Sequence, residues 1–218
     1  APAGHLLAGC QDGKLRVVDV DAGAVVTTIA AQAEAVRVVA VLHDGRAASA
    51  AVEHNVQLWN VGTGACVATL VGHTFRVTSL AVLADGRLAS GSFDYTVRLW
   101  DVTSGTCLRV LTGHTYLVPV DKLTVLPDNQ LAGVSGKDVI MVWDTQRLND
   151  SGIPVSAPAS TPSTSMNDYA GGTRPRQPLV CSFWADISLA ALAPLPGNRL
   201  ATGVDGGVYL WQLPPRSS

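Results

Sequence analysis

Tryptophan recurs in this chain at a nearly constant interval, and that interval limits the folds open to it. Trp59, Trp100 and Trp143 follow one another at almost equal steps. Val18 stands one such step before Trp59, in a segment of similar pattern, LRVVDV. A step of about 40 residues is typical of repeat proteins, whose units bury their apolar faces against one another. The sequence therefore predicts an array of similar units rather than one unrepeated core.

The most complete unit is Gly72–Asp101, GHTFRVTSLAVLADGRLASGSFDYTVRLWD. Its short apolar runs are separated by turn residues such as Asp85-Gly86, a pair that favours a tight hairpin. No long window keeps the i, i+3, i+4 apolar stripe of a helix. The unit and the residues after it therefore predict four β-strands, at Val77–Leu83, Leu88–Ser92, Thr96–Trp100 and Thr106–Leu111.

This unit resembles one blade of a WD40-repeat β-propeller. The resemblance lies in the Gly72-His73 pair at its start, Asp94 in the turn before the third strand, and the Trp100-Asp101 pair at its end. All three stand at the family's spacing. The resemblance implies an all-β propeller in which each four-stranded sheet is a blade packed between two neighbours.

We expect one WD40 propeller region over residues 1–218, with about 18 strands in five blades of three, four, four, four and three strands. A Ser-, Thr- and Pro-rich stretch, 146–178, predicts an insertion in the fourth unit. Because seven blades are commonest in the family, we expect part of a larger seven-bladed ring; a five-bladed ring is the alternative. The units are expected at about 1–30, 31–71, 72–112, 113–185 and 186–218.

One unit holds a serine, a histidine and an aspartate, the residue types of a catalytic triad. In the family that this unit resembles, the same positions and the tryptophan form a structural, hydrogen-bonded tetrad. The resemblance therefore implies that buried polar groups satisfy one another here, and that they are not catalytic. The tetrad residues are His73, Ser90, Asp94 and Trp100.

Composition and charge argue against several other classes of function. A net charge of −2 gives no electrostatic reason to expect nucleic acid as a partner. The most apolar region, 15–42, is interrupted by charged residues and cannot form a membrane-spanning helix. The five histidines form no metal-ligand cluster, no cofactor motif is present, and the four cysteines include no CxxC pair. We expect no metal, no cofactor and no membrane contact, and a cytoplasmic or nuclear location.

Binding residues are expected on the rim that carries the blade-to-blade connections and the turn with Asp94. The family's usual contact positions lie three and five residues after the histidine and immediately before the aspartate. An aromatic side chain beside an arginine is typical of an interaction hot spot. The expected rim residues are Arg37, Val52, Arg76, Thr78, Phe93 and Leu117.

The resemblance implies a non-enzymatic scaffold that binds protein or peptide partners, monomeric within a larger polypeptide or complex. Two alternatives remain open. One is a substrate-receptor propeller of a ubiquitin ligase, in which Arg37 and Arg76 would recognise an acidic or phosphorylated peptide. The other is a propeller hydrolase, for which the sequence offers no convergent carboxylate or metal set.

Overall fold

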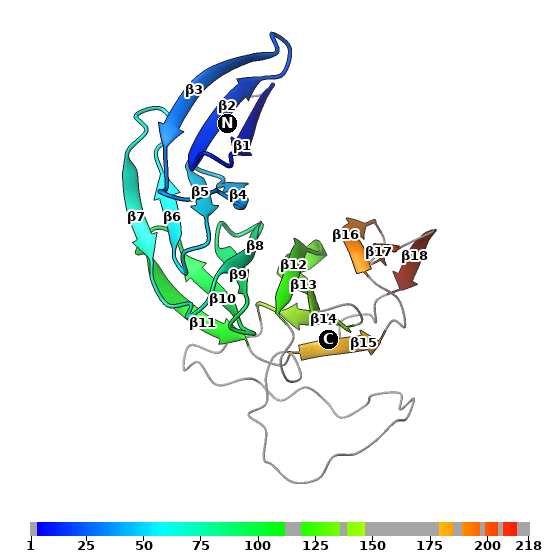
Figure 1. Cartoon of the computed structure of the whole chain (residues 1–218). Coiled ribbons are helices and arrows are strands. Elements are labelled where there is room, and N and C mark those ends of the chain that lie inside the picture. The colour runs from blue at the N-terminus through cyan, green and yellow to red at the C-terminus, as the bar shows by residue number, and fades with distance from the viewer. Residues whose placement is uncertain are drawn as a thin grey trace.

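The computed structural model describes residues 4–111, 119–135, 139–146, 179–184, 189–196, 199–204 and 207–212. These residues form 18 strands in five antiparallel sheets, which follow one another in an arc (Figure 1). The sheets contain three, four, four, four and three strands in chain order, as predicted. We call them blades 1 to 5.

The strands of each blade are consecutive in the sequence and pair as a meander. Blade 1 contains β1 (His5–Gly9), β2 (Lys14–Asp19) and β3 (Ala24–Ala30). Blade 2 contains β4 (Val38–Val41), β5 (Ala47–Ala50), β6 (Val56–Trp59) and β7 (Cys66–Leu70). Blade 3 contains β8 (Val77–Val82), β9 (Leu88–Ser92), β10 (Val97–Asp101) and β11 (Thr106–Leu111).

The last two blades continue the same pattern. Blade 4 contains β12 (Val120–Val125), a short 3-10 turn η1 (Pro127–Asn129), β13 (Gln130–Ser135), β14 (Val139–Asp144) and β15 (Leu179–Trp184). Blade 5 contains β16 (Leu189–Leu195), β17 (Arg199–Val204) and β18 (Gly207–Gln212). The fourth strand of blade 4 therefore resumes after the predicted insertion, nearly all of which (147–178) lies outside the described residues. The larger seven-bladed ring stays a prediction.

The recurring tryptophan fills the space between neighbouring blades. Trp100, on β10, is 1% exposed and packs with residues of blade 2, among them Leu42 and Leu58. Trp59 packs in the same way in the cluster shared with blade 1, and Trp143 in the cluster shared with blade 3. The tryptophans recur at a regular interval because each one packs against the blade before it. Replacing such a buried Trp by Ala typically costs about 3–5 kcal/mol.

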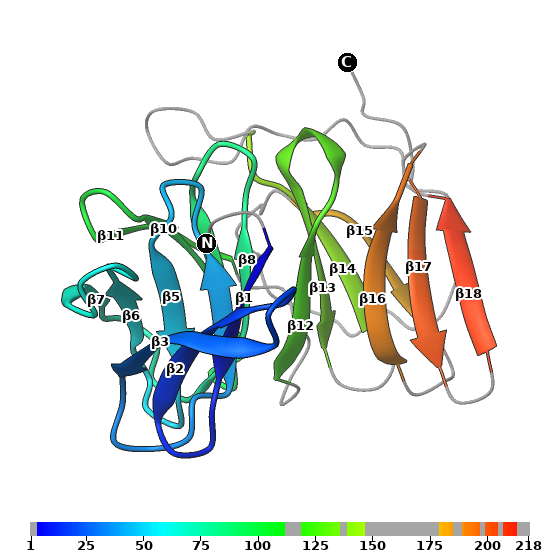
Figure 2. The same ribbon diagram turned by 90° about the horizontal axis from the view of Figure 1, so that it is seen from above.

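Each blade has two ends, which the meander separates. In blade 3, the connection from β7 to β8 and the turn from β9 to β10 lie at one end. The turns from β8 to β9 and from β10 to β11 lie at the other end. Figure 2 shows the corresponding β12–β13 turn of blade 4 at the top of its sheet. We call the end with the β9–β10 turn the His73 rim and the other end the opposite rim.

Candidate functional site

The four predicted tetrad residues meet inside blade 3. His73 Nδ1 lies 2.8 Å from Asp94 Oδ2, and His73 Nε2 lies 2.7 Å from Ser90 Oγ. The Trp100 indole donates to the same Ser90 oxygen at 2.7 Å. The chain of contacts therefore runs from the turn carboxylate through the imidazole and the strand hydroxyl to the tryptophan.

The chemistry of the groups sets the direction of the hydrogen bonds. A carboxylate only accepts, so Nδ1–H of His73 donates to Asp94. In the neutral imidazole Nε2 then accepts from the Ser90 hydroxyl, whose oxygen accepts in turn from Trp100. Every member is thereby satisfied away from water, as a buried polar network requires.

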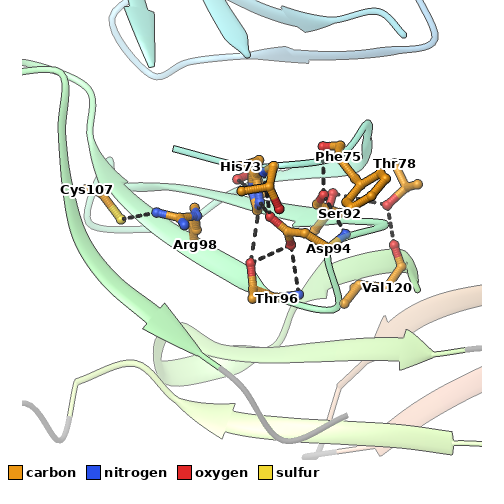
Figure 3. Close-up of polar contacts among 12 residues, drawn as sticks. His73, Phe75, Thr78, Ser92, Asp94, Thr96, Arg98, Cys107 and Val120 are labelled. Carbon is orange, nitrogen blue, oxygen red and sulfur yellow. Dashed lines mark hydrogen bonds and ion pairs between the residues drawn. The ribbon is translucent and has the colours of Figure 1, made fainter. Parts of the chain in front are cut away.

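Asp94 is held by its own turn as well as by His73. Its Oδ1 accepts from the Thr96 hydroxyl at 2.6 Å and from the Thr96 backbone at 3.0 Å (Figure 3). Its Oδ2 also accepts from the Thr74 backbone at 3.0 Å. Burial by itself raises the pKa of Asp94, but the hydrogen bonds from His73, Thr96 and Thr74 outweigh it and hold this pKa well below its usual range.

This arrangement is unsuited to nucleophilic catalysis. Ser90 lies in the interior of β9 and is 0% exposed, so its oxygen has no open path to a substrate. The same oxygen is already bonded to Trp100 at 2.7 Å. A triad serine instead stands exposed beside an oxyanion hole. The contacts are those of a device that fixes the turn and the strand register.

Blade 2 retains only part of the tetrad. Trp59 donates to Ser49 at 2.9 Å, which matches the Trp100–Ser90 bond. Gln32 stands in place of the histidine, and neither its amide nitrogen nor its amide oxygen has a hydrogen-bond partner among the described residues, although both are buried. Glu53, in place of the aspartate, is exposed. Of the four tetrad positions in blade 2, the described residues therefore form only the tryptophan–serine bond.

Two of the residues predicted to lie on the binding rim, Arg76 and Phe93, are in contact with each other. The Arg76 guanidinium carbon lies 3.7 Å from the centre of the Phe93 ring, a cation–π arrangement. Arg76 is exposed and Phe93 half-buried, so the stacked pair forms part of the surface of the His73 rim. Arg37 is also exposed, and Val52 is 40% exposed, both in blade 2.

Two other residues predicted to lie on the binding rim, Thr78 and Leu117, are not seen as exposed contact residues. The Thr78 hydroxyl is hydrogen-bonded to the carbonyl of Gly91 at 3.0 Å and to that of Val120 in blade 4 (Figure 3). It therefore joins two blades and is not available as a donor to a partner. Leu117 lies outside the described residues.

An aromatic contact that the sequence did not predict lies beside this pair. Phe75 is 59% exposed, and its ring centre lies 6.1 Å from that of His54 in blade 2. Tyr95, in the β9–β10 turn, is 37% exposed with a left-handed φ of 67°. An aromatic residue two places after the histidine, next to Arg76, was the available signal. We call Arg37, Val52, His54, Phe75, Arg76 and Phe93 the aromatic rim.

Across the described ranges, no group of three or more His, Cys, Asp or Glu side chains is placed to hold a metal ion. In the same part of the chain, no helix has the length and apolar character needed to cross a membrane.

Comparison with known proteins agrees with the blade geometry. Residues 64–101 match the family model for the WD domain, G-beta repeat. No curated protein sequence matches the chain. A solved structure, that of the WD40 propeller protein U3-55K, is similar in fold with a TM-score of 0.74 at 19% sequence identity. The similarity covers 96% of this chain but only 58% of that one. Residues 64–101 therefore form a WD40 repeat, and the chain has the fold of a WD40-type β-propeller.

Proposed function

We propose that this chain is a non-enzymatic scaffold that binds a protein or peptide partner on the aromatic rim. WD40 propellers generally bind protein partners, which supports the class of function. The observation that carries the proposal is the Arg76–Phe93 stack at 3.7 Å beside the exposed Phe75. Contiguous exposed apolar patches on a protein surface often mark binding sites.

The Arg76–Phe93 stack is suited to recognition because it is held in place before a partner arrives. The backbone N–H of Phe93 donates to the Arg76 carbonyl at 3.0 Å, so the two residues are also joined through the main chain. A guanidinium that already lies on a ring loses less side-chain entropy when it binds. Arginine and aromatic residues are the types that dominate binding energy at protein interfaces.

The two arginines of the aromatic rim favour an acidic partner, although the exposed Glu53 lies between Val52 and His54 in the chain. Arg37 and Arg76 form no ion pair with any described residue, whereas Arg16, Arg46 and Arg87 each pair with an aspartate. Free guanidinium groups bind carboxylates and phosphates through paired hydrogen bonds. This observation supports the second candidate, a receptor for an acidic or phosphorylated peptide such as a ubiquitin-ligase substrate.

An array of short peptides tests both candidates. Purified protein is applied to acidic, phosphorylated, neutral and basic peptides that share one aromatic anchor. The scaffold proposal expects saturable binding that Arg37→Ala, Arg76→Ala and Phe93→Ala together abolish. The receptor candidate expects in addition a preference for acidic or phosphorylated peptides that weakens as salt is raised.

A control variant removes one guanidinium group and one exposed apolar side chain from β11, outside the aromatic rim. Leu108→Ala with Arg109→Ala changes β11, away from the rim turns, and should leave binding unchanged. Equal loss in the control, or full binding by the triple variant, would exclude the aromatic rim as the site. Hydrolysis that disappears in Ser90→Ala with the fold intact would overturn the non-enzymatic assignment.

A further inference from the structure

The opposite rim of blades 3 and 4 is closed by one asparagine. Asn129, at the turn between β12 and β13, is 6% exposed and has a left-handed φ of 57°. Its Oδ1 accepts from the backbone N–H of Ala84 at 2.8 Å, and its Nδ2 donates to Asp85 Oδ2 at 2.9 Å. One carboxamide thus binds one donor and one acceptor on the neighbouring blade. We call these two bonds the Asn129 clasp.

The same turn occurs in blades 2 and 3 with glycine in place of this asparagine. The three turns read LHDGR, LADGR and LPDNQ, and each is closed by a hydrogen bond from its first N–H to its last carbonyl at 2.8–2.9 Å. Gly86 of blade 3 therefore corresponds to Asn129 of blade 4. Gly86 also has a left-handed φ, of 89°, and a Cβ built on it meets nothing within 4 Å.

The boundary between blades 2 and 3 contains a pocket where the clasp would be. It has a volume of about 200 Å³, and its lining includes Leu42, His43, Asp44, Gly86, Arg87 and Val102. Val102 corresponds to Thr145 of blade 4, whose hydroxyl accepts from Arg87 at 3.1 Å. At this boundary Val102 offers no hydroxyl, and its neighbours Asp101 and Thr103 also line the pocket.

The two groups that the Asn129 clasp uses both have counterparts in this pocket. The His43 backbone N–H corresponds to that of Ala84, and it donates to no acceptor among the described residues. Asp44 corresponds to Asp85. Arg46 Nη2 lies 2.7 Å from Asp44 Oδ2, as Arg87 Nη2 lies 2.6 Å from Asp85 Oδ2.

These two carboxylates differ in that Asp85 accepts a hydrogen bond from the Asn129 amide and Asp44 has no amide donor among the described residues. Asp85 Oδ2 accepts from Asn129 as well as from its arginine, whereas Asp44 Oδ2 accepts, within the described part of the chain, from Arg46 alone. The Asp44 side chain is 48% exposed and that of Asp85 is 35% exposed. The pocket therefore contains counterparts of the N–H donor and the carboxylate acceptor that the Asn129 carboxamide binds one blade away.

We propose that this pocket binds a primary carboxamide, the Asn or Gln side chain of a partner polypeptide. The ligand oxygen accepts from the His43 N–H and the ligand –NH₂ donates to Asp44, as Asn129 does at the next boundary. A carboxylate of the same shape lacks the donor and is repelled by Asp44, so the site distinguishes Asn from Asp. The pocket lies on the opposite rim, so its binding is independent of the aromatic rim.

The test is a titration of the folded chain with Nα-acetyl-asparagine N-methylamide, followed by ¹⁵N–¹H spectra. The His43 N–H signal should shift and saturate. The capped aspartate should bind at least about tenfold more weakly, because one hydrogen bond to a charged group is lost. Equal binding of the two compounds, or no saturable shift at His43, would overturn the proposal. Tighter binding of free L-asparagine would reject a polypeptide source for the ligand.

Two substitutions, with a third as control, locate the site. Gly86→Asn should supply the missing carboxamide from within, raise Tm and abolish binding of the capped asparagine. Gly45→Asn is its control, because Gly45 has the same turn position, a φ of 84° and open space, but does not line the pocket. It should bind as the unsubstituted protein does. Asp44→Ala, which changes an exposed side chain, should weaken binding at least about tenfold and so tests the site even if Gly86→Asn does not fold. Unchanged affinity in Asp44→Ala would overturn the assignment.

Discussion

The Trp100 indole donates to the Ser90 hydroxyl at 2.7 Å inside blade 3. The same pair exists in blade 2 as Trp59 and Ser49, at 2.9 Å. The two serines differ in what else they hold, since Ser90 also bonds His73 at 2.7 Å and Ser49 has no such second side-chain partner among the described residues. The serine at this repeat position therefore makes more hydrogen bonds in blade 3 than in blade 2.

Replacing each serine measures this difference. Ser90→Ala leaves both the Trp100 nitrogen and His73 Nε2 buried without a partner, so it should lower the free energy of unfolding by about 2–4 kcal/mol. Ser49→Ala leaves only the Trp59 indole nitrogen without a partner and should lower the free energy of unfolding by about 1–2 kcal/mol. Urea unfolding of the two variants makes the comparison. Equal losses would mean that the bond from Ser90 to His73 contributes nothing.

Rebuilding the tetrad in blade 2 should stabilise the protein. Gln32→His with Glu53→Asp places the two missing groups beside Ser49 and Trp59, and removes a buried amide that has no partner among the described residues. The gain expected is about 1–2 kcal/mol in the free energy of unfolding. Each single change should give less, because the histidine and the aspartate depend on each other. A double variant no more stable than its parent would show that the blade 2 backbone cannot hold the tetrad.

The Asp94 carboxylate should make the protein sensitive to acid. Its pKa is lowered on folding, so its stabilising contribution is complete above the ordinary aspartate pKa of about 3.9. That contribution is lost as the pH falls below about 4 towards the folded-state pKa. Urea midpoints of the unsubstituted protein should drop through this range, whereas Asp94→Asn should start lower and fall less. Asp12→Asn, at an exposed ion pair with Arg16, should keep the full acid slope. Parallel pH profiles for Asp94→Asn and its parent would refute the linkage.

Opening the Asn129 clasp should weaken the boundary between blades 3 and 4. Asn129→Gly keeps the left-handed φ without strain and removes both hydrogen bonds to the Ala84-Asp85 turn, so we expect a loss of about 1–3 kcal/mol by urea unfolding. Asn129→Asp places a second carboxylate against Asp85 and should cost at least as much at pH 7. That deficit should shrink near pH 4, where one carboxylate protonates. Unchanged stability of Asn129→Gly would show that the clasp does not hold the two blades.

Much of the fold could be predicted because its signals are local. The tryptophan interval and the turn residues predict five blades of three, four, four, four and three strands, which the structure contains. The return of β15 at Leu179–Trp184 after the insertion follows from the same count. The tetrad in blade 3 was also predictable, since only that unit carries all four residue types at the positions that the family uses.

The side-chain contacts between neighbouring blades could not be predicted from the sequence. Phe75 meets His54 across two blades, and whether an aromatic side chain faces a neighbour or packs beneath its own turn depends on the angle between the sheets. Thr78 was expected on the rim, yet its hydroxyl bonds the Val120 carbonyl of the next blade. A strand pattern alone does not report such partners, because they belong to other blades and lie far away in the chain.

The sequence by itself determined the repeat, its strands and the tetrad, because hydrophobic alternation, turn chemistry and tryptophan spacing act within a single repeat unit. Tertiary structure alone decided what happens between the blades. It showed that Asn129 fills the boundary of blades 3 and 4, and that Gly86 leaves the equivalent space open at the boundary of blades 2 and 3. The reason is physical: a carboxamide closes a boundary only where packing brings a free N–H and a carboxylate of the neighbouring blade within hydrogen-bonding distance of it.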